Sequence, residues 1–283
     1  MEIIKSYKSM QQYADRIRSK QETIALVPTM GFFHKGHLSL MKKAKEVSNH
    51  LVVSLFVNPT QFAPDEDFDS YPRDTERDLA LAEKESVNVM FMPEREELYS
   101  SEFQTYVNLE KLPNHLCGLS RPTFFRGVAT VVSKLFNIIK PHYAIFGQKD
   151  FQQLAVIRQM VKDLNFDIEI IGVPTFRESD GLAMSSRNKY LDSNQRKTAL
   201  CLFQSLEKAF ALVQAGETDP TRIIAKATSL IESHAKTSID YIKICDPITI
   251  EDVAVIKKRA LMALAVNVGK TRLIDNRILE IKT

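Results

Sequence analysis

Cysteine and glycine are both scarce in this sequence of 283 residues. The three cysteines, Cys117, Cys201 and Cys245, lie far apart and form no C-x-x-C or Cys/His spacing. Disulfide frameworks and zinc sites need such patterns, so the sequence predicts neither, and buried free thiols are the expected alternative. Most of the nine glycines lie beside the motifs described below. This distribution indicates that glycine is kept for special backbone positions.

Long apolar runs and an excess of one charge are also absent. No apolar run approaches the roughly 18 residues of a membrane span, and the N-terminal MEIIKSYKSM lacks the apolar segment of a signal peptide. The 38 basic and 35 acidic residues leave a net charge of +3, too balanced to indicate a surface for nucleic acid or membrane. The 44% of hydrophobic residues supplies an ample core. Because neither a membrane span nor a signal peptide is indicated, we expect a soluble cytoplasmic protein.

The most informative stretch is IALVPTMGFFHKGH, residues 24–37. Its apolar start predicts a buried strand, Gly31 a turn, and the segment from His34 to His37 a helix start. Such a helix N-terminus favours an anion, and two imidazoles beside it are able to donate hydrogen bonds to phosphate. A lone H-x-x-H is more often a surface or capping pair. An H-x-G-H directly after a buried strand, however, resembles the signature of the HxGH nucleotidyltransferase superfamily, which binds ATP and catalyses attack at its α-phosphate.

Strands and helices alternate along the first 175 residues. Strands are predicted at 23–27, 51–58, 87–92, 142–146 and 168–173, with an additional one at 105–109, and helices at 9–18, 37–50, 74–85, 128–139 and 151–164. This alternation is typical of a Rossmann-like parallel α/β sheet, which binds ligands at the carboxyl ends of its strands.

The pattern changes beyond about residue 175. Helices at 194–215 and 221–234 and strands at 239–245 and 261–268 predict a smaller α+β domain that covers the nucleotide site. We therefore expect two domains, at 1–175 and 176–283.

Polar side chains follow several of the predicted strands. Gln61 in FVNPTQF offers a donor and an acceptor to a small polar substrate, and Gln153 lies one turn into the helix after FGQKD. Lys149 in that motif stands where it would neutralise phosphate charge. Taken singly, each of these residues has a plainer interpretation as a solvated side chain.

Two loops carry further candidates for phosphate binding. The loop DGLAMSSRN contains two serines followed by Arg187, which suggests a mobile clamp on a triphosphate. Arg121 and Arg126 suggest a phosphate gate, although loop arginines are more often merely exposed. No Ser/His/Asp or Cys/His arrangement indicates a covalent nucleophile.

Six motifs occur in the order and at the spacing of the pantothenate synthetase (pantoate–β-alanine ligase) family: PTMGFFHKGH, FVNPTQF, YPRD, RPTFFRGV, FGQKDFQQL and DGLAMSSRNKYL. The resemblance spans essentially the whole chain. It implies a homodimeric enzyme that joins pantoate to β-alanine with ATP and Mg²⁺ through a pantoyl-adenylate intermediate, releasing AMP and pyrophosphate.

The resemblance also implies roles for individual residues. The catalytic positions are His34, His37, Lys149 and Arg187, with His37 at the position of the proton donor. Gln61 and Gln153 match pantoate-binding glutamines, Gln61 also lies near the β-alanine site, and Asp78 is implied as a Mg²⁺ contact. The ATP-binding positions are Met30, Gly31, Phe32, Phe33, His34, Lys35, Gly36, His37, Gly147, Gln148, Lys149, Asp150, Phe176, Met184, Ser185, Ser186 and Arg187.

Three residues depart from the family pattern. Lys35 and Gln148 replace residues that are usually acidic, which is expected to alter local charge without removing a contact. Phe124 stands where the loop of RPTFFRGV commonly carries a histidine, so a role for that histidine does not transfer. Two other classes stay open: another HxGH nucleotidyltransferase, which would keep the nucleotide on its product, and a nucleotide-binding module without turnover.

Overall fold

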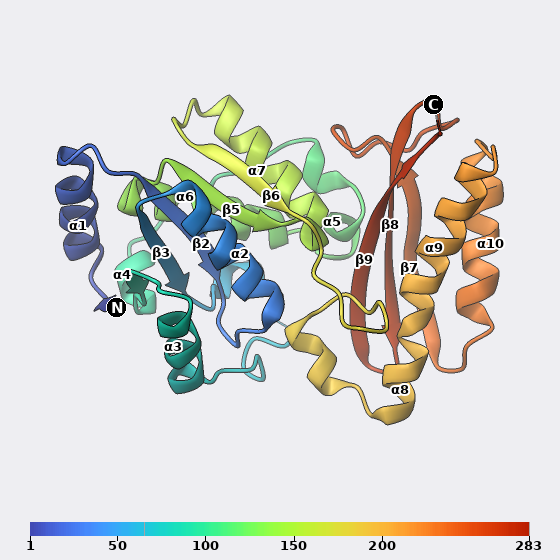
Figure 1. Ribbon diagram of the computed structural model, residues 1–283, viewed down its shortest axis with the longest axis horizontal. Helices are drawn as coiled ribbons and strands as arrows, with labels where there is room; N and C mark the ends of the chain where they lie inside the picture. Colours follow the sequence, from blue (N-terminus) through green and yellow to red (C-terminus); the bar gives the residue numbers. More distant parts are fainter. Residues whose placement is uncertain (65, 283) are drawn as a thin grey trace. The chain divides into compact units, whose positions relative to one another are not determined.

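The computed structural model describes residues 1–64 and 66–282. Six parallel strands form one sheet in the order β1-β4-β3-β2-β5-β6 (Figure 1). The strands are β1 Glu2–Ile4, β2 Ile24–Thr29, β3 His50–Leu55, β4 Val89–Phe91, β5 Tyr143–Gly147 and β6 Glu169–Val173. Strand β2 pairs with β3 on one side and with β5 on the other. From β2 the chain first builds the sheet outward through β3 and β4, and it then returns to the other side of β2 to add β5 and β6. The carboxyl end of β2 is therefore a topological switch point, where open α/β sheets bind their ligands.

Helices connect these strands, as the sequence predicts for a Rossmann-like fold. They are α1 Tyr7–Ser19, α2 Lys35–Val47, α3 Thr75–Lys84, α4 Arg95–Leu98, α6 Phe124–Ile139 and α7 Phe151–Asp163. Met41 and Ala44 of α2 are fully buried in a cluster with apolar side chains of β2, β3 and β5. Most residues of α6 are buried, in agreement with its nearly continuous apolar sequence.

The second sheet has three antiparallel strands, β7 Thr237–Cys245, β8 Arg259–Val268 and β9 Thr271–Glu280. Helices α8 Ser193–Thr198, α9 Leu200–Gln214 and α10 Pro220–Glu232 precede it in the chain. Leu202, Leu206 and Ile223 from the helices share one apolar core with Leu264 and Val266 of β8. This is the smaller α+β part that the sequence predicts.

The described chain also contains short helical segments. These are η1 Pro59–Gln61, η2 Leu112–Asn114, α5 Cys117–Ser120, η3 Gln148–Asp150 and η4 Ser186–Tyr190. Several of the predicted site residues lie in or beside them.

The chain divides into two compact units. The N-terminal unit comprises Met1–Glu110, Arg121–Gln148 and Val156–Pro174, and the C-terminal unit comprises Lys111–Ser120, Lys149–Ala155 and Thr175–Thr283. The chain thus passes into the C-terminal unit at residue 175, but two earlier segments also belong to that unit. Local periodicity does not reveal them, because contacts between residues far apart in the sequence define them. The roles expected for domains 1–175 and 176–283 stay a prediction.

Some predicted elements differ from the structure. The strand expected at 105–109 is wrong: the structure has no strand in this largely exposed segment, where the Val107 N–H donates to Thr130 Oγ1 at 3.0 Å. The helix expected at 194–215 is two helices, α8 and α9. Strands β1 and β9 were not predicted, because β1 is only three residues long and polar residues interrupt the apolar pattern of β9. The three cysteines are free and buried, as expected.

Candidate active site

The turn after β2 is held by one buried carboxylate. Asp78 of α3 is 1% exposed, and its two oxygens accept hydrogen bonds from the N–H groups of Phe32 and Phe33, each at 2.6 Å. Gly31 and Phe32 both have positive φ, 85° and 52°, and a Cβ at Gly31 would lie 3.0 Å from Asp78 Oδ2. A glycine at 31 therefore lets the carboxylate approach the backbone closely enough to fix an otherwise unfavourable turn.

The charge state of Asp78 reflects its burial. Burial raises the pKa of this carboxyl above its ordinary value, whereas the hydrogen bonds from Phe33 and Phe32 act in the opposite direction. Arg77 also braces the turn, since its Nη2 donates to the Phe33 carbonyl at 3.0 Å and its guanidinium lies over the Phe32 ring. The sequence suggested Asp78 only as a metal contact, because its partners lie more than forty positions away along the chain.

His34 and His37 meet at the N-terminus of α2. His34 is the N-cap residue, and its N–H donates to His37 Nδ1 at 3.3 Å. The two rings lie 4.1 Å apart between centroids, and the buried Phe33 ring packs on His37. Because Nδ1 of His37 accepts a hydrogen bond, the neutral imidazole carries its proton on Nε2. That N–H, at the positive end of the helix dipole, suits an anionic ligand.

The amide of Gln61 has a fixed orientation beside the same turn. Gln61 is 7% exposed, its Nε2 donates to Met30 Sδ at 2.8 Å, and its Oε1 accepts from Asn58 Nδ2 at 3.2 Å. Asn58 also donates to the Gly127 carbonyl at 3.1 Å. A Cβ at Gly127 would lie 2.3 Å from the Thr60 carbonyl oxygen, so only glycine lets α6 pack this closely on η1. Sequence reasoning missed Asn58, although its place at the end of a strand in FVNPTQF is the same signal that selected Gln61.

The arginines suggested as a phosphate gate have protein partners instead. Arg121 forms an ion pair with Glu66, with both contacts at 2.5 Å, and donates to the Gln61 carbonyl at 3.2 Å. Its guanidinium lies 3.8 Å from the ring centroid of Phe124, which fills the place of the family histidine. Arg126 lies over the Tyr106 ring. The contacts of Arg121 brace the segment that carries Gln61, and the gate interpretation of the two arginines stays a prediction.

The N-terminal unit thus brings several predicted residues to one edge of its sheet. Gln61 contacts Met30, His34 contacts His37, and Asp78 binds the turn between these two pairs. Gly147 ends β5, which pairs directly with β2, and Gln148 follows it. Lys35 and Gly36 form the first turn of α2. This edge is the switch point defined by the strand order.

The C-terminal unit carries the remaining predicted residues. Lys149 lies 3.5 Å from Asp150, and its carbonyl accepts from Asn276 Nδ2 at 2.8 Å. Gln153 is half-buried in the first turn of α7, whereas its neighbour Gln152 is buried and donates to two backbone carbonyls in and just after η2. Gln152 is therefore bonded to the backbone, and Gln153 is the more exposed of the two glutamines.

The loop at 175–188 is well braced. The Met184 N–H donates to the Phe176 carbonyl at 2.9 Å, and the Phe176 side chain is 37% exposed. Ser185 caps η4, since its Oγ accepts from the Arg187 N–H at 3.3 Å, and Ser186 is nearly buried. These hydrogen bonds hold the backbone from Met184 to Arg187 in one conformation.

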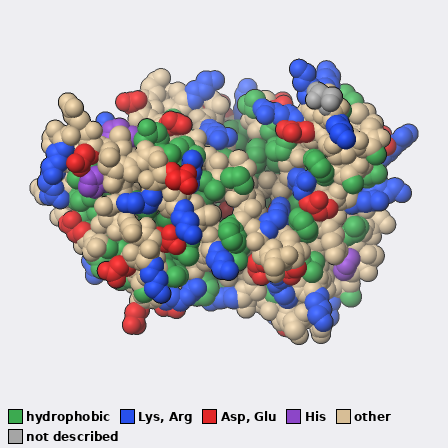
Figure 2. Space-filling model, in the orientation of Figure 1, with side chains coloured by type: hydrophobic (Ala, Val, Ile, Leu, Met, Phe, Trp, Pro, Cys, Tyr) green, Lys and Arg blue, Asp and Glu red, His purple; other side chains and the backbone are tan. Residues whose placement is uncertain are grey.

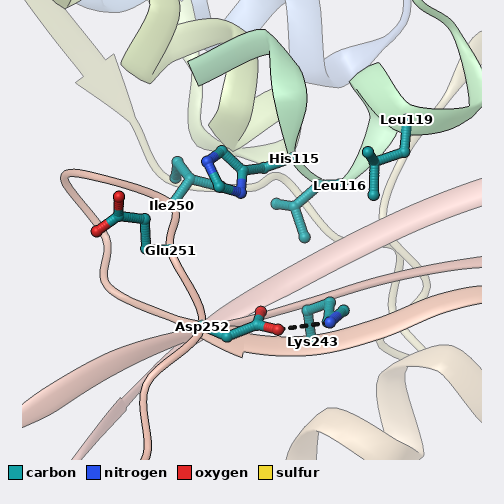
Figure 3. Close-up of a pocket in the computed structure, with 7 residues that line it drawn as sticks. All are labelled: His115, Leu116, Leu119, Lys243, Ile250, Glu251 and Asp252. Atoms are coloured by element: carbon teal, nitrogen blue, oxygen red, sulfur yellow. Dashed lines mark hydrogen bonds and ion pairs between the residues drawn. The ribbon is translucent and has the colours of Figure 1, made fainter. Parts of the chain in front are cut away.

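A cavity of about 170 Å³ lies elsewhere in the C-terminal unit (Figure 3). His115, Leu116, Leu119, Lys243, Ile250, Glu251 and Asp252 line it, and Lys243 and Asp252 form an ion pair at 2.5 Å. None of the predicted site residues lines this cavity.

Among residues 1–64 and 66–282, no group of three or more His, Cys, Asp or Glu side chains has the arrangement of a metal site.

Basic and acidic side chains are interspersed on the face drawn in Figure 2, as a net charge of +3 leads one to expect. Within the described part of the chain, every helix is too short or too polar to cross a bilayer.

A sequence model of the pantoate–β-alanine ligase family matches residues 2–278. The chain belongs to the pantoate–β-alanine ligase family. The pantothenate synthetase of Desulfatibacillum aliphaticivorans is 59% identical over 280 residues, which cover 99% of this chain and 100% of that protein. That of Thermotoga petrophila is 52% identical over 279 residues, with coverage of 99% and 100%.

Solved structures of this ligase family have the same fold. Pantothenate synthetase from Thermus thermophilus superimposes with a TM-score of 0.93 at 39% identity, covering 98% of this chain and 99% of that one. Pantoate–β-alanine ligase from Francisella tularensis, complexed with β,γ-ATP and β-alanine, gives 0.82 at 34% identity, with coverage of 98% and 97%. The family resemblance, the Rossmann-like fold and the assignment as a ligase of pantothenate biosynthesis are thereby confirmed.

Proposed function

We propose that this enzyme condenses pantoate with β-alanine in two steps at the switch point of its parallel sheet. In the first step the pantoate carboxylate attacks the α-phosphorus of ATP, which gives pantoyl adenylate and pyrophosphate. In the second the neutral amine of β-alanine attacks the acyl carbon and expels AMP. The observation that carries the proposal is the pair of imidazoles at the start of α2, which follows a turn whose Met30 accepts a hydrogen bond from the Gln61 amide.

The first step needs no general base. A carboxylate is already ionised at neutral pH, with an ordinary pKa of about 4. The enzyme instead has to align two anions and place donors where negative charge develops. His34 and His37 supply donors from the N-terminal unit, and His37 Nε2 is the atom that we assign to the α-phosphate region.

Residues of the C-terminal unit are proposed to neutralise the triphosphate. Lys149 and Arg187 carry the positive charge, and Ser185 and Ser186 add hydroxyl donors on the same braced loop. Phe176 and Met184 are proposed as apolar contacts of the nucleotide. Asp150 of the same unit, and Gly147 and Gln148 of the N-terminal unit, are proposed as further nucleotide contacts.

Pantoate is proposed to bind through two glutamines. The Gln61 amide, oriented by Asn58 and Met30, would donate to and accept from its polar groups, and Gln153 would add a second amide. Gln61 is also assigned to the side from which β-alanine approaches. Neither step needs a covalent bond to the protein.

Mg²⁺ is proposed as the ion that accompanies ATP, where it would neutralise phosphate charge. Mg²⁺ is commonly held by substrate phosphates together with only one or two carboxylates. Asp78 is a poor fit as such a ligand, because it is 1% exposed and both of its oxygens accept backbone N–H groups. The metal contact of Asp78 thus stays a prediction that this geometry argues against, whereas the ATP phosphates fit as ligands.

An AMP-release assay with each substrate omitted in turn tests the proposal. Free AMP should form only when ATP, pantoate and β-alanine are all present. Release of pyrophosphate with retention of the nucleotide on a product would instead indicate another HxGH nucleotidyltransferase. ATP binding without turnover would indicate a binding module.

The proposal includes a homodimer, on the strength of the family resemblance alone, and a location in the cytoplasm, as the sequence analysis expects. Light scattering coupled to size-exclusion chromatography should give twice the chain mass of 32.2 kDa. A mass of one chain at micromolar concentration would refute the dimer.

A further inference from the structure

A buried ion pair on β9 leads to two segments of the C-terminal unit that are proposed to contact ATP. The Asp275 side chain is 1% exposed, and its two oxygens accept bonds from the Arg177 guanidinium at 2.7 and 3.0 Å. This paired geometry fixes the direction of the Arg177 side chain as well as its distance.

Arg177 lies at the base of the loop that carries Ser185, Ser186 and Arg187. Its Nη1 also donates to the Gly181 carbonyl at 3.0 Å, across the loop. Its backbone forms an isolated antiparallel bridge with Ala183, on the opposite arm. The Arg177–Asp275 pair therefore anchors both arms of the loop to the three-stranded sheet.

Asn276, the next residue of β9, holds the second segment. Its Nδ2 donates to the Lys149 carbonyl at 2.8 Å, while its own N–H donates to Asp275 Oδ1 at 2.8 Å. Successive side chains of a strand point to opposite faces, so two neighbouring positions are able to reach two separate segments. One short piece of β9 thus connects the Lys149 backbone with the loop at residues 177–187.

We propose that Arg177, Asp275 and Asn276 are positioning residues for the triphosphate, which keep Lys149 and the loop of Arg187 in one fixed arrangement. They act through those residues and are assigned no contact with ATP. The inference rests on the proposed function, because it presupposes that Lys149 and Arg187 hold the phosphates during adenylation. A displacement of about 1 Å at such a site lowers the rate by up to about 100-fold.

The test measures the two half-reactions separately in full-length variants. Pantoate-dependent exchange of pyrophosphate into ATP reports adenylation, and the reaction of preformed pantoyl adenylate with β-alanine reports amide formation. The main variant is Asn276→Ala, which removes the donor to Lys149, and Asp275→Asn is the second. Glu207→Gln is the matched control, since it weakens the ion pair between Glu207 of α9 and Arg277, the residue of β9 that follows Asn276. Circular dichroism and melting curves check folding.

We expect Asn276→Ala to lower adenylation by about tenfold or more and to raise the KM for ATP, with amide formation reduced by no more than about twofold. Asp275→Asn should show the same split, and if it fails to fold, Asn276→Ala alone decides. Glu207→Gln should match the wild type in both steps. Equal loss of both half-reactions, or wild-type adenylation by Asn276→Ala, would overturn the inference. Failure of the wild type to exchange pyrophosphate would overturn the proposed function itself.

Discussion

Asp78→Asn is the substitution that most directly tests the construction of the site. The carboxylate accepts two hydrogen bonds of 2.6 Å from backbone N–H groups, one of them from Phe33, which is fully buried. Asparagine has nearly the same shape but offers one acceptor oxygen and turns an NH₂ group toward the second N–H. One buried donor loses its partner and the other loses a charged acceptor, which together costs about 2–4 kcal/mol.

The expected loss is measurable by denaturant and thermal unfolding. At about 2–4 °C per kcal/mol for a chain of this size, the melting temperature should fall by roughly 4–16 °C. Because the turn carries Met30 to His34, ATP binding measured by calorimetry should weaken as well. Asp74→Asn on the same helix is the control: Asp74 caps α3 by accepting from the Arg77 N–H, and asparagine caps helices equally well.

The pH dependence of this loss has a defined sign. Burial raises the pKa of Asp78 above 3.8, so the folded protein keeps a proton that the unfolded chain has already released. The contribution of Asp78 to stability therefore decreases as the pH rises from 3.8 through its folded pKa, whereas Asp78→Asn lacks this change. The stability deficit of the variant should be smaller at pH 7 than near pH 4. A variant as stable as Asp74→Asn with unchanged ATP affinity would refute our account of the turn.

Three further substitutions address individual roles. His37→Ala should fold normally and lose about 10²–10³ in adenylation rate, the usual cost of one donor to developing charge, and wild-type turnover would remove His37 from the mechanism. Gln61→Ala should weaken pantoate binding and leave ATP binding nearly intact in equilibrium titrations; equal loss of both would mean that the segment had collapsed. Lys149→Ala should depress adenylation strongly while preformed pantoyl adenylate still reacts with β-alanine, and an equal loss in both steps would contradict its assignment to the leaving pyrophosphate.

The sequence by itself determined the central part of the fold and the family. The strand predicted at 23–27 and found at 24–29, the turn at Gly31, and the helix predicted at 37–50 and found at 35–47 follow from local pattern, because each depends on neighbours within a few residues. The same holds for the long buried helix α6. Six motifs in register identified the family, which the family model and the relatives confirm. The roles of the individual site residues stay predictions.

Only the tertiary structure decided which side chains fix the site. Asp78 of α3 binds the turn that contains Phe32, which lies 46 positions earlier in the chain. Arg121, which the sequence suggested as a phosphate ligand, forms an ion pair with Glu66. Strand β9 escaped prediction because its polar Asp275 and Asn276 break the apolar alternation. They are buried there only because Arg177 and the Lys149 carbonyl satisfy them. Such pairings join residues distant in sequence, and no local periodicity records them, since the polar partners become neighbours only once the chain has folded.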